Sequence, residues 1–117
     1  EAIAYCKERK QFGKPISAFQ NTQFRFAELQ ARIDAARLLT WRAATAKDNG
    51  EAYNVYAAEA KLVASDVAND VCRAAVQFMG GYGYCGVERK LRDVKITEIY
   101  EGTSEVMKMV IAGALLR

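Results

Sequence analysis

The stretch YNVYAAEAKLVASDVANDVCRAAVQF, residues 53–78, decides the fold. Its apolar residues recur at every third or fourth position, which is the spacing that places side chains on one face of an α-helix. Half of this stripe is alanine, so a neighbouring helix can approach it closely, as in a helical bundle. The stripe consists of Tyr53, Ala57, Ala60, Ala64, Val67, Val71, Ala74 and Phe78.

A similar stripe across residues 19–49 predicts a second helix, about 45 Å long at 1.5 Å per residue. Asn49 and Gly50 lie between the two stripes, and glycine after the last periodic residue commonly ends a helix. Two long helices joined by so short a turn must run antiparallel. The members of this stripe are Phe19, Thr22, Phe26, Leu29, Ile33, Ala36, Thr40 and Ala43.

Capping and stop signals divide the rest of the chain. Residues 1–9 have the pattern of the last turns of a helix, which Gly13 and Pro15 end, and Ser17 is the predicted N-cap of the helix at 19–49. The run GGYG predicts the end of the second long helix and a turn. Thr103 is the predicted N-cap of a last helix, with Glu105 in its first turn. The expected elements after the GGYG run at 80–83 are short helical turns at 87–94 and 96–99, a loop at 100–102 and a helix at 104–116.

These elements predict an all-α protein, an antiparallel up-down four-helix-type bundle whose first helix is truncated. Residues 1–117 form one domain, because this length supports a single core and no repeat or linker interrupts the chain.

The composition excludes several kinds of chemistry. The chain has no histidine, which excludes Ser-His-Asp and Cys-His catalysis and any histidine metal site, and favours a bound cofactor. Its 17 Lys and Arg residues and 14 Asp and Glu residues are spread along the chain, so we expect no nucleic-acid surface. The chain contains no run of about 18 apolar residues, so we expect no membrane-spanning helix.

The three cysteines indicate free thiols in a reducing compartment. Cys6, Cys72 and Cys85 are odd in number and show no C-x-x-C spacing. That pattern argues against a disulfide framework and against a structural metal site.

Glu101 is the most suggestive single residue. It lies in a short loop between Tyr100 and Gly102, just before a helix N-cap, where a carboxylate is exposed and can act as a base. The alternative is that Glu101 merely interacts favourably with the positive end of the helix dipole. The residues by themselves leave both interpretations open.

Four ordered segments carry a resemblance to a known family: ERKQFGKPI at 8–16, QNTQF at 20–24, QFMGGYGY at 77–84, and RD at 92–93 leading to IYEGTSE at 99–105. In this order and at this spacing they resemble the C-terminal helical domain of acyl-CoA dehydrogenases, in particular the butyryl-CoA or short-chain branch. The resemblance covers the chain from end to end.

The resemblance implies an FAD enzyme that oxidises an acyl-CoA to the trans-2-enoyl-CoA. Glu101 matches the base that removes the α-proton, while the β-hydrogen leaves as a hydride to the flavin. Tyr100 and Gly102 match residues that line the acyl channel, and the Glu101 backbone N–H would bind the thioester oxygen.

The resemblance also implies the flavin contacts. Arg9 and Gln20 match positions that reach the FAD of a neighbouring subunit, and Gln77, Gly80 and Gly81 match the stretch that closes over its adenosine part. A second group, at the start of the last helix, matches the segment that lies along the dinucleotide: Thr103, Ser104 and Glu105. Because these contacts cross subunits, the resemblance implies a homotetramer.

The electron-transfer flavoprotein is the implied electron acceptor, in the bacterial cytoplasm or the mitochondrial matrix. The family's N-terminal helical domain and middle β-domain have no counterpart in residues 1–117, so the chain alone is expected to be inactive. Two alternatives remain open. One is a non-catalytic helical interaction module derived from the same fold, and the other is an acyl-CoA oxidase that shares the base.

Overall fold

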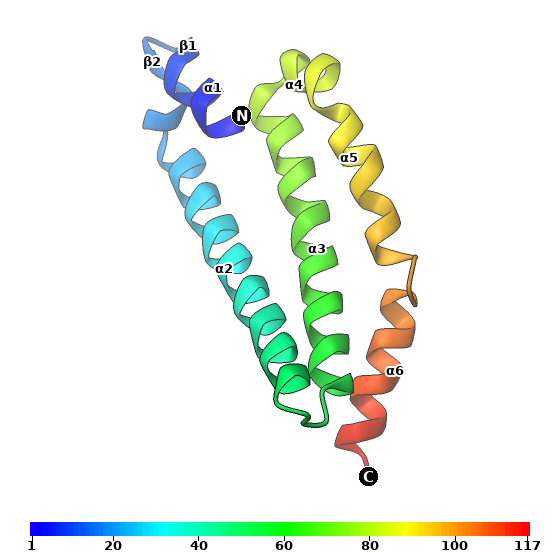
Figure 1. Ribbon diagram of the computed structural model, residues 1–117. Helices are drawn as coiled ribbons and strands as arrows, with labels where there is room; N and C mark the ends of the chain where they lie inside the picture. The colour runs from blue at the N-terminus through cyan, green and yellow to red at the C-terminus, as the bar shows by residue number, and fades with distance from the viewer.

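The computed structural model describes residues 1–117 as three helical columns lying side by side, within an envelope of 57 × 26 × 23 Å (Figure 1). The first two columns are α2 (Gln20–Asp48) and α3 (Asn54–Met79). The third column consists of α4 (Gly81–Gly86), α5 (Glu88–Val94), the 3₁₀ turn η2 (Lys95–Glu98) and α6 (Ser104–Leu115). The predicted all-α antiparallel bundle is confirmed.

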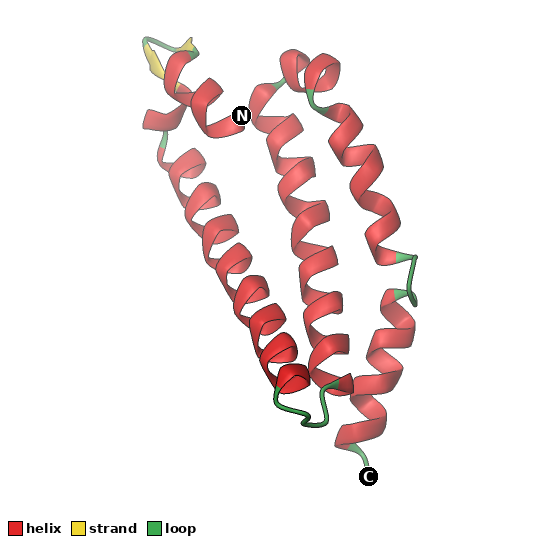
Figure 2. Ribbon diagram, in the orientation of Figure 1, coloured by secondary structure: helices red, strands yellow, loops and turns green.

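The short helix α1 (Ala2–Glu8) covers one end of these columns, so the first of the four helices is a stub (Figure 2). A hairpin of two-residue strands follows it, β1 (Lys10–Gln11) and β2 (Lys14–Pro15), and then the 3₁₀ turn η1 (Ile16–Ala18). The Ser17 prediction is wrong, because Ser17 lies inside η1 and Phe19 occupies the N-cap position of α2 without a side-chain cap. Instead, the Gln23 side chain donates a hydrogen bond to the Ser17 carbonyl at 3.0 Å.

The two predicted stripes meet between α2 and α3. Gly50 takes up φ +75°, a conformation favourable for glycine, and the loop around it reverses the chain. The buried side chains along this contact are small, so the two helix backbones can come close together. They include Ala36, Ala43 and Ala46 on α2, and Ala58, Ala60 and Ala74 on α3.

The junction of α3 and α4 differs from the predicted turn. Gly80, at φ +56°, ends α3 as expected, but Gly81–Gly86 then forms a further short helix. The reason lies at Gly83, where a Cβ atom would come within 2.5 Å of the Val76 carbonyl oxygen. Glycine therefore lets α4 turn back directly against α3, and the chain starts its third column there.

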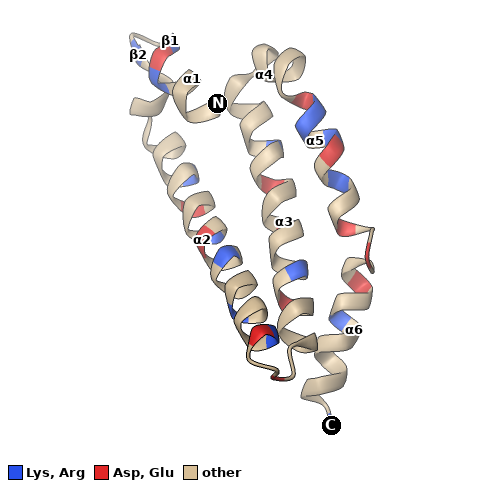
Figure 3. Cartoon of the chain, in the orientation of Figure 1, with Lys and Arg blue, Asp and Glu red and all other residues tan.

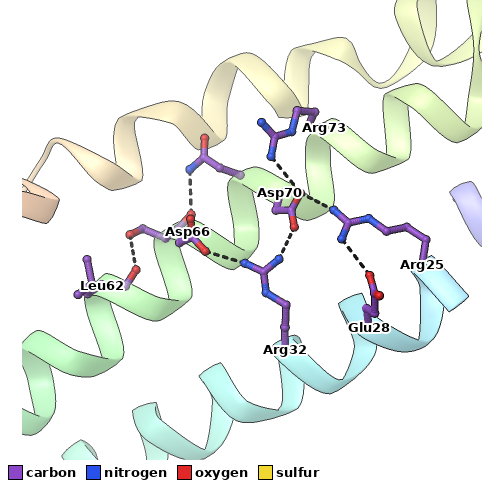
Figure 4. Close-up of polar contacts among 9 residues, drawn as sticks. Arg25, Glu28, Arg32, Leu62, Asp66, Asp70 and Arg73 are labelled. Atoms are coloured by element: carbon purple, nitrogen blue, oxygen red, sulfur yellow. Dashed lines mark hydrogen bonds and ion pairs between the residues drawn. The ribbon is translucent and has the colours of Figure 1, made fainter.

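A cluster of charged side chains joins α2 to α3 (Figure 4). Asp70 of α3 is buried and accepts hydrogen bonds from Arg25 at 2.6 Å, from Arg73 at 3.1 Å and from Arg32. Arg32 also binds Asp66 at 2.6 Å. Burial raises the pKa of the Asp70 carboxyl, but the hydrogen bonds from Arg73 and Arg25 outweigh this effect and leave the pKa lowered.

The core is thin, and several large apolar side chains remain exposed. Only 14 of the 117 residues are buried, so the long helices have apolar side chains on faces that nothing in this chain covers. On α2 these are Phe24, Leu38 and Trp41, and on and just after α6 they are Val106, Met109, Leu115 and Leu116. None of the helices combines the length and apolar character needed to cross a bilayer.

Candidate functional site

The loop at residues 100–102 has an unusual backbone. Glu101 adopts φ +53°, and only one other residue that is not glycine, Phe12, has a positive φ. Gly102 follows at φ +99°. A non-glycine residue held in this region stores strain, and such residues are concentrated at functional sites. The Glu101 side chain is exposed, and Tyr100 is half exposed.

Two contacts hold this loop against the helices. The Lys61 ammonium of α3 donates a hydrogen bond to the Gly102 carbonyl oxygen at 2.6 Å. On the other side, a Cβ atom at Gly102 would lie 2.7 Å from the Met107 methyl carbon, so α6 packs directly against the glycine. The loop is thereby fixed between α3 and α6.

The start of α6 is capped as predicted. The Thr103 hydroxyl accepts a hydrogen bond from the Val106 N–H at 3.4 Å, which confirms the predicted N-cap. Hydrogen bonds from the Glu105 backbone N–H and from the Thr103 side chain hold the pKa of the Glu105 carboxyl below its usual value, and the nearby Lys108 and Lys61 charges act in the same direction.

A cleft of about 600 Å³ lies where α2, α3, η2 and the start of α6 meet. Thr103, Ser104 and Glu105 all line it, so the structure brings these three predicted residues to one cavity. Glu101 does not line the cleft, but Ile99 and Thr103, which lie on either side of its loop, do. Charges of both signs surround the cleft: Arg32, Lys95 and Lys108 against Asp66, Glu98 and Glu105.

The remaining predicted residues lie at the end of the bundle where α1, the start of α2 and α4 are found, away from the loop before α6, which lies partway along the third column (Figure 1). Arg9 ends α1, Gln20 begins α2, and Gln77 lies in the last turn of α3, just before Gly80 and Gly81. All five residues are exposed. The structure therefore divides the predicted site residues into two groups that do not meet within one chain.

The group near α1 and α4 can bind an anionic or polar ligand from outside the chain. The side chains of Arg9, Gln20 and Gln77 are exposed and make no hydrogen bond or ion pair within the protein. A guanidinium that is not neutralised by a carboxylate suits a phosphate, and free amides suit the polar edges of a nucleotide.

Acidic and basic side chains are otherwise distributed over the helices, and α4 and the distal part of α6 carry none (Figure 3).

Lys61 and Arg32 are site residues that the sequence analysis missed. Lys61 is the one cation within the mostly apolar run AAEAKLVA, which is a possible signal, but nothing in that run indicates a contact with Gly102. The three cysteines are free, as predicted: Cys6 is buried, Cys72 is half-buried and Cys85 is exposed. No group of three or more metal-binding side chains is arranged to hold an ion.

The family model described as "Acyl-CoA dehydrogenase, C-terminal domain" matches residues 1–116. The solved structure of butyryl-CoA dehydrogenase from Megasphaera elsdenii superimposes with a TM-score of 0.96 at 53% identity, covering 99% of this chain and 31% of that one. A caffeyl-CoA reductase–Etf complex subunit of Acetobacterium woodii is 48% identical over all of this chain and 32% of its own length.

A more distant solved structure, the FAD complex of PigA, is 32% identical with a TM-score of 0.93, covering 97% of this chain and 30% of that one. The chain spans about a third of the length of the curated relatives that it matches, 31% and 32% for two of them.

Proposed function

Since the chain belongs to the family of acyl-CoA dehydrogenase C-terminal domains, we propose that it is the base-bearing domain of a flavoenzyme that dehydrogenates short-chain acyl-CoA thioesters. The observation that carries the proposal is the backbone of Glu101, an exposed carboxylate in a strained left-handed conformation beside the start of α6. A helical scaffold has no need of such a residue, whereas a base has to be held in one orientation.

Glu101 acts in this proposal as the acceptor of the substrate α-proton. Its carboxylate takes the proton, and its backbone N–H binds the thioester oxygen as negative charge develops there. Tyr100 and Gly102 border the acyl chain. When bound, FAD supplies the hydride acceptor for the β-hydrogen.

The proposed flavin contacts come from the two separate groups of residues. Arg9 binds a pyrophosphate oxygen and Gln20 a polar group of an FAD held by a neighbouring subunit, and the stretch from Gln77 to Gly81 closes over the adenosine part. Thr103, Ser104 and Glu105 lie along the dinucleotide at the cleft. The separation of the two groups in one chain supports this arrangement, because one bound dinucleotide can then use residues from two chains.

A homotetramer built through this domain follows from the same reasoning. The exposed apolar side chains of α2 and α6 support it, because surfaces of this kind on a protein are usually covered by another chain. The electron-transfer flavoprotein is the proposed electron acceptor, and the similarity to a subunit of an Etf complex supports it. We place the enzyme in the cytoplasm of a bacterium or in the mitochondrial matrix of a eukaryote.

The test uses the whole flavoprotein that contains this chain, mixed anaerobically with butyryl-CoA while flavin bleaching is followed. Glu101→Gln keeps the side-chain shape and removes the base, so bleaching should slow by several orders of magnitude while butyryl-CoA still perturbs the flavin spectrum. Glu59→Gln, which changes a carboxylate paired with Arg42 on the helix surface, is the matched control and should bleach at the parental rate. Parental bleaching in the Glu101→Gln variant would refute the assignment.

The second candidate is a helical interaction module without catalysis, which the exposed apolar faces alone would also support. The same experiment separates the two. A module would leave the flavin unbleached by butyryl-CoA in the parental protein, and Glu101→Gln would change nothing.

A further inference from the structure

We propose that Lys61 is a positioning residue for Glu101, acting through the backbone of the loop that carries it. This inference rests on the proposed function, because it assigns a role to Lys61 within the same site. Lys61 is the one side chain that donates a hydrogen bond to this loop.

The loop at Glu101 and Gly102 has almost no hydrogen bonding of its own. Tyr100 donates its N–H to the Ile96 carbonyl at 3.0 Å before the loop, and Met107 donates to the Thr103 carbonyl at 3.0 Å after it. Between these points neither Glu101 nor Gly102 makes a backbone–backbone hydrogen bond. The contact from Lys61 is therefore the only hydrogen bond that either residue makes with the rest of the protein.

The anchor comes from a rigid part of the fold. Lys61 lies on α3 between the buried residues Ala60 and Ser65, in the helix that packs against both other columns. Its ammonium reaches Gly102 over a partly buried path, 41 residues along the chain, and the 2.6 Å distance is that of a charge-assisted hydrogen bond. A bond of this kind fixes the position of the Gly102 carbonyl oxygen relative to α3.

The position of that carbonyl determines the position of Glu101. The peptide plane between Gly102 and Thr103 is held at its oxygen, and Met107 blocks movement on the α6 side. Glu101 precedes this plane with φ +53°, a conformation that a glutamate leaves when nothing opposes it. Without Lys61 the loop can relax toward an ordinary conformation, which moves the Glu101 carboxylate away from the substrate α-carbon.

A competing explanation is that Lys61 only balances the charge of Glu105. The two groups are close enough for Lys61 to lower the pKa of the Glu105 carboxyl, although the backbone N–H of Glu105 and the Thr103 hydroxyl contribute more. Charge balance alone would affect cleft charge and ligand binding. Positioning would affect the proton-transfer step and the mobility of the loop, so the two roles can be measured separately.

The experiment compares Lys61→Met with the parental protein in the whole flavoprotein that contains this chain. Methionine keeps an unbranched side chain and removes the donor. The matched control is Lys47→Met, an exposed lysine near the far end of α2. Two quantities are measured: amide hydrogen exchange in a peptide covering residues 100–107, and the rate of flavin bleaching by butyryl-CoA together with the Kd from the flavin spectral change.

We expect exchange at Val106 and Met107, whose N–H groups bond to Thr103 at the end of the loop, to accelerate at least tenfold in Lys61→Met, with exchange in α2 and α3 unchanged. Bleaching should slow by about a hundredfold, which is the size of effect expected when a reacting group is misplaced by about 1 Å. The Kd for butyryl-CoA should change by less than about threefold. Lys61→Arg keeps a cationic donor and should restore most of the bleaching rate, and Lys47→Met should match the parental protein in both measurements.

Parental exchange at Val106 and Met107, or parental bleaching with an altered Kd, would overturn the inference and favour the charge-balance role. If Lys61→Met does not fold, Lys61→Leu, which also lacks a donor, is measured instead, with the same expected results and the same refutation. Glu101→Gln is run in parallel to separate this inference from the proposed function. Slow bleaching in Glu101→Gln with normal bleaching in Lys61→Met refutes Lys61 alone, whereas parental bleaching in Glu101→Gln refutes the base itself.

Discussion

Asp70 is the residue at which a single substitution should most clearly weaken the pairing of α2 and α3. Asp70→Asn keeps the shape of the side chain and removes its charge. The buried carboxylate accepts hydrogen bonds from three arginines, two from α2 and one from α3 (Figure 4). An amide in its place presents a donor to guanidinium groups that have only donors.

The size of the loss depends on how far each arginine is exposed. The Arg73 side chain is 74% exposed and can return to water, so its contact contributes little. Arg25 and Arg32 are 34% and 39% exposed, so their bonds to Asp70 are partly screened. Two bonds at the low end of the range for charged groups, about 1.5 kcal/mol each, give an expected loss of about 3 kcal/mol in the free energy of unfolding.

Asp66 provides the matched control, because it lies one turn earlier on α3 and binds the same Arg32, but its side chain is 68% exposed. Asp66→Asn should cost less than about 1 kcal/mol. The assay is urea unfolding at pH 7, followed by far-UV circular dichroism, for the parental protein and both variants. Equal losses in Asp70→Asn and Asp66→Asn would show that burial does not set the strength of this cluster.

Three more changes test other parts of the structure. Folding lowers the pKa of Asp70, so the stability that this carboxylate contributes should be complete above about pH 4 and should fall as the pH decreases through its folded-state pKa. The loss of folded protein with decreasing pH, followed by circular dichroism, should therefore be shallower in Asp70→Asn. An acid profile identical to that of the parental protein would contradict this. Gly83→Ala should lower the melting temperature strongly, because the new Cβ would collide with the Val76 backbone. Gly86→Ala in the same helix is the control, because a Cβ there meets open space. Similar melting temperatures for the two variants would argue against the packing at Gly83. Thr103→Ala removes the N-cap of α6 and should cost about 1 kcal/mol in thermal unfolding, with Thr103→Ser restoring most of it; no rescue by serine would mean that the hydroxyl is not the stabilising group.

Two of the cysteines, Cys6 and Cys72, lie in surroundings that keep their thiols protonated. Burial raises the pKa of the Cys6 and Cys72 thiols, so neither is a reactive thiolate at neutral pH. Neither thiol therefore enters the proposed chemistry.

The sequence predicted which residues form the candidate site, but it did not predict how those residues are arranged in space. Thr103 as an N-cap followed from hydroxyl chemistry next to a periodic segment, and it is confirmed. Ser17 looked equally suitable and is not a cap, because the chain forms η1 there and the Gln23 side chain binds the Ser17 carbonyl. The flavin and substrate roles of the other residues stay predictions.

The sequence by itself determined the two long helices, the last helix, the turn at Gly50 and the antiparallel order of the bundle, because apolar periodicity and caps act over three or four residues. Only the tertiary structure decided the features that join distant segments. These are the Lys61 contact with Gly102, the cluster around Asp70 and the return of α4 against Val76 at Gly83. Each depends on the axial register of two columns, and that register is set by packing along whole helices, which no short window of sequence contains.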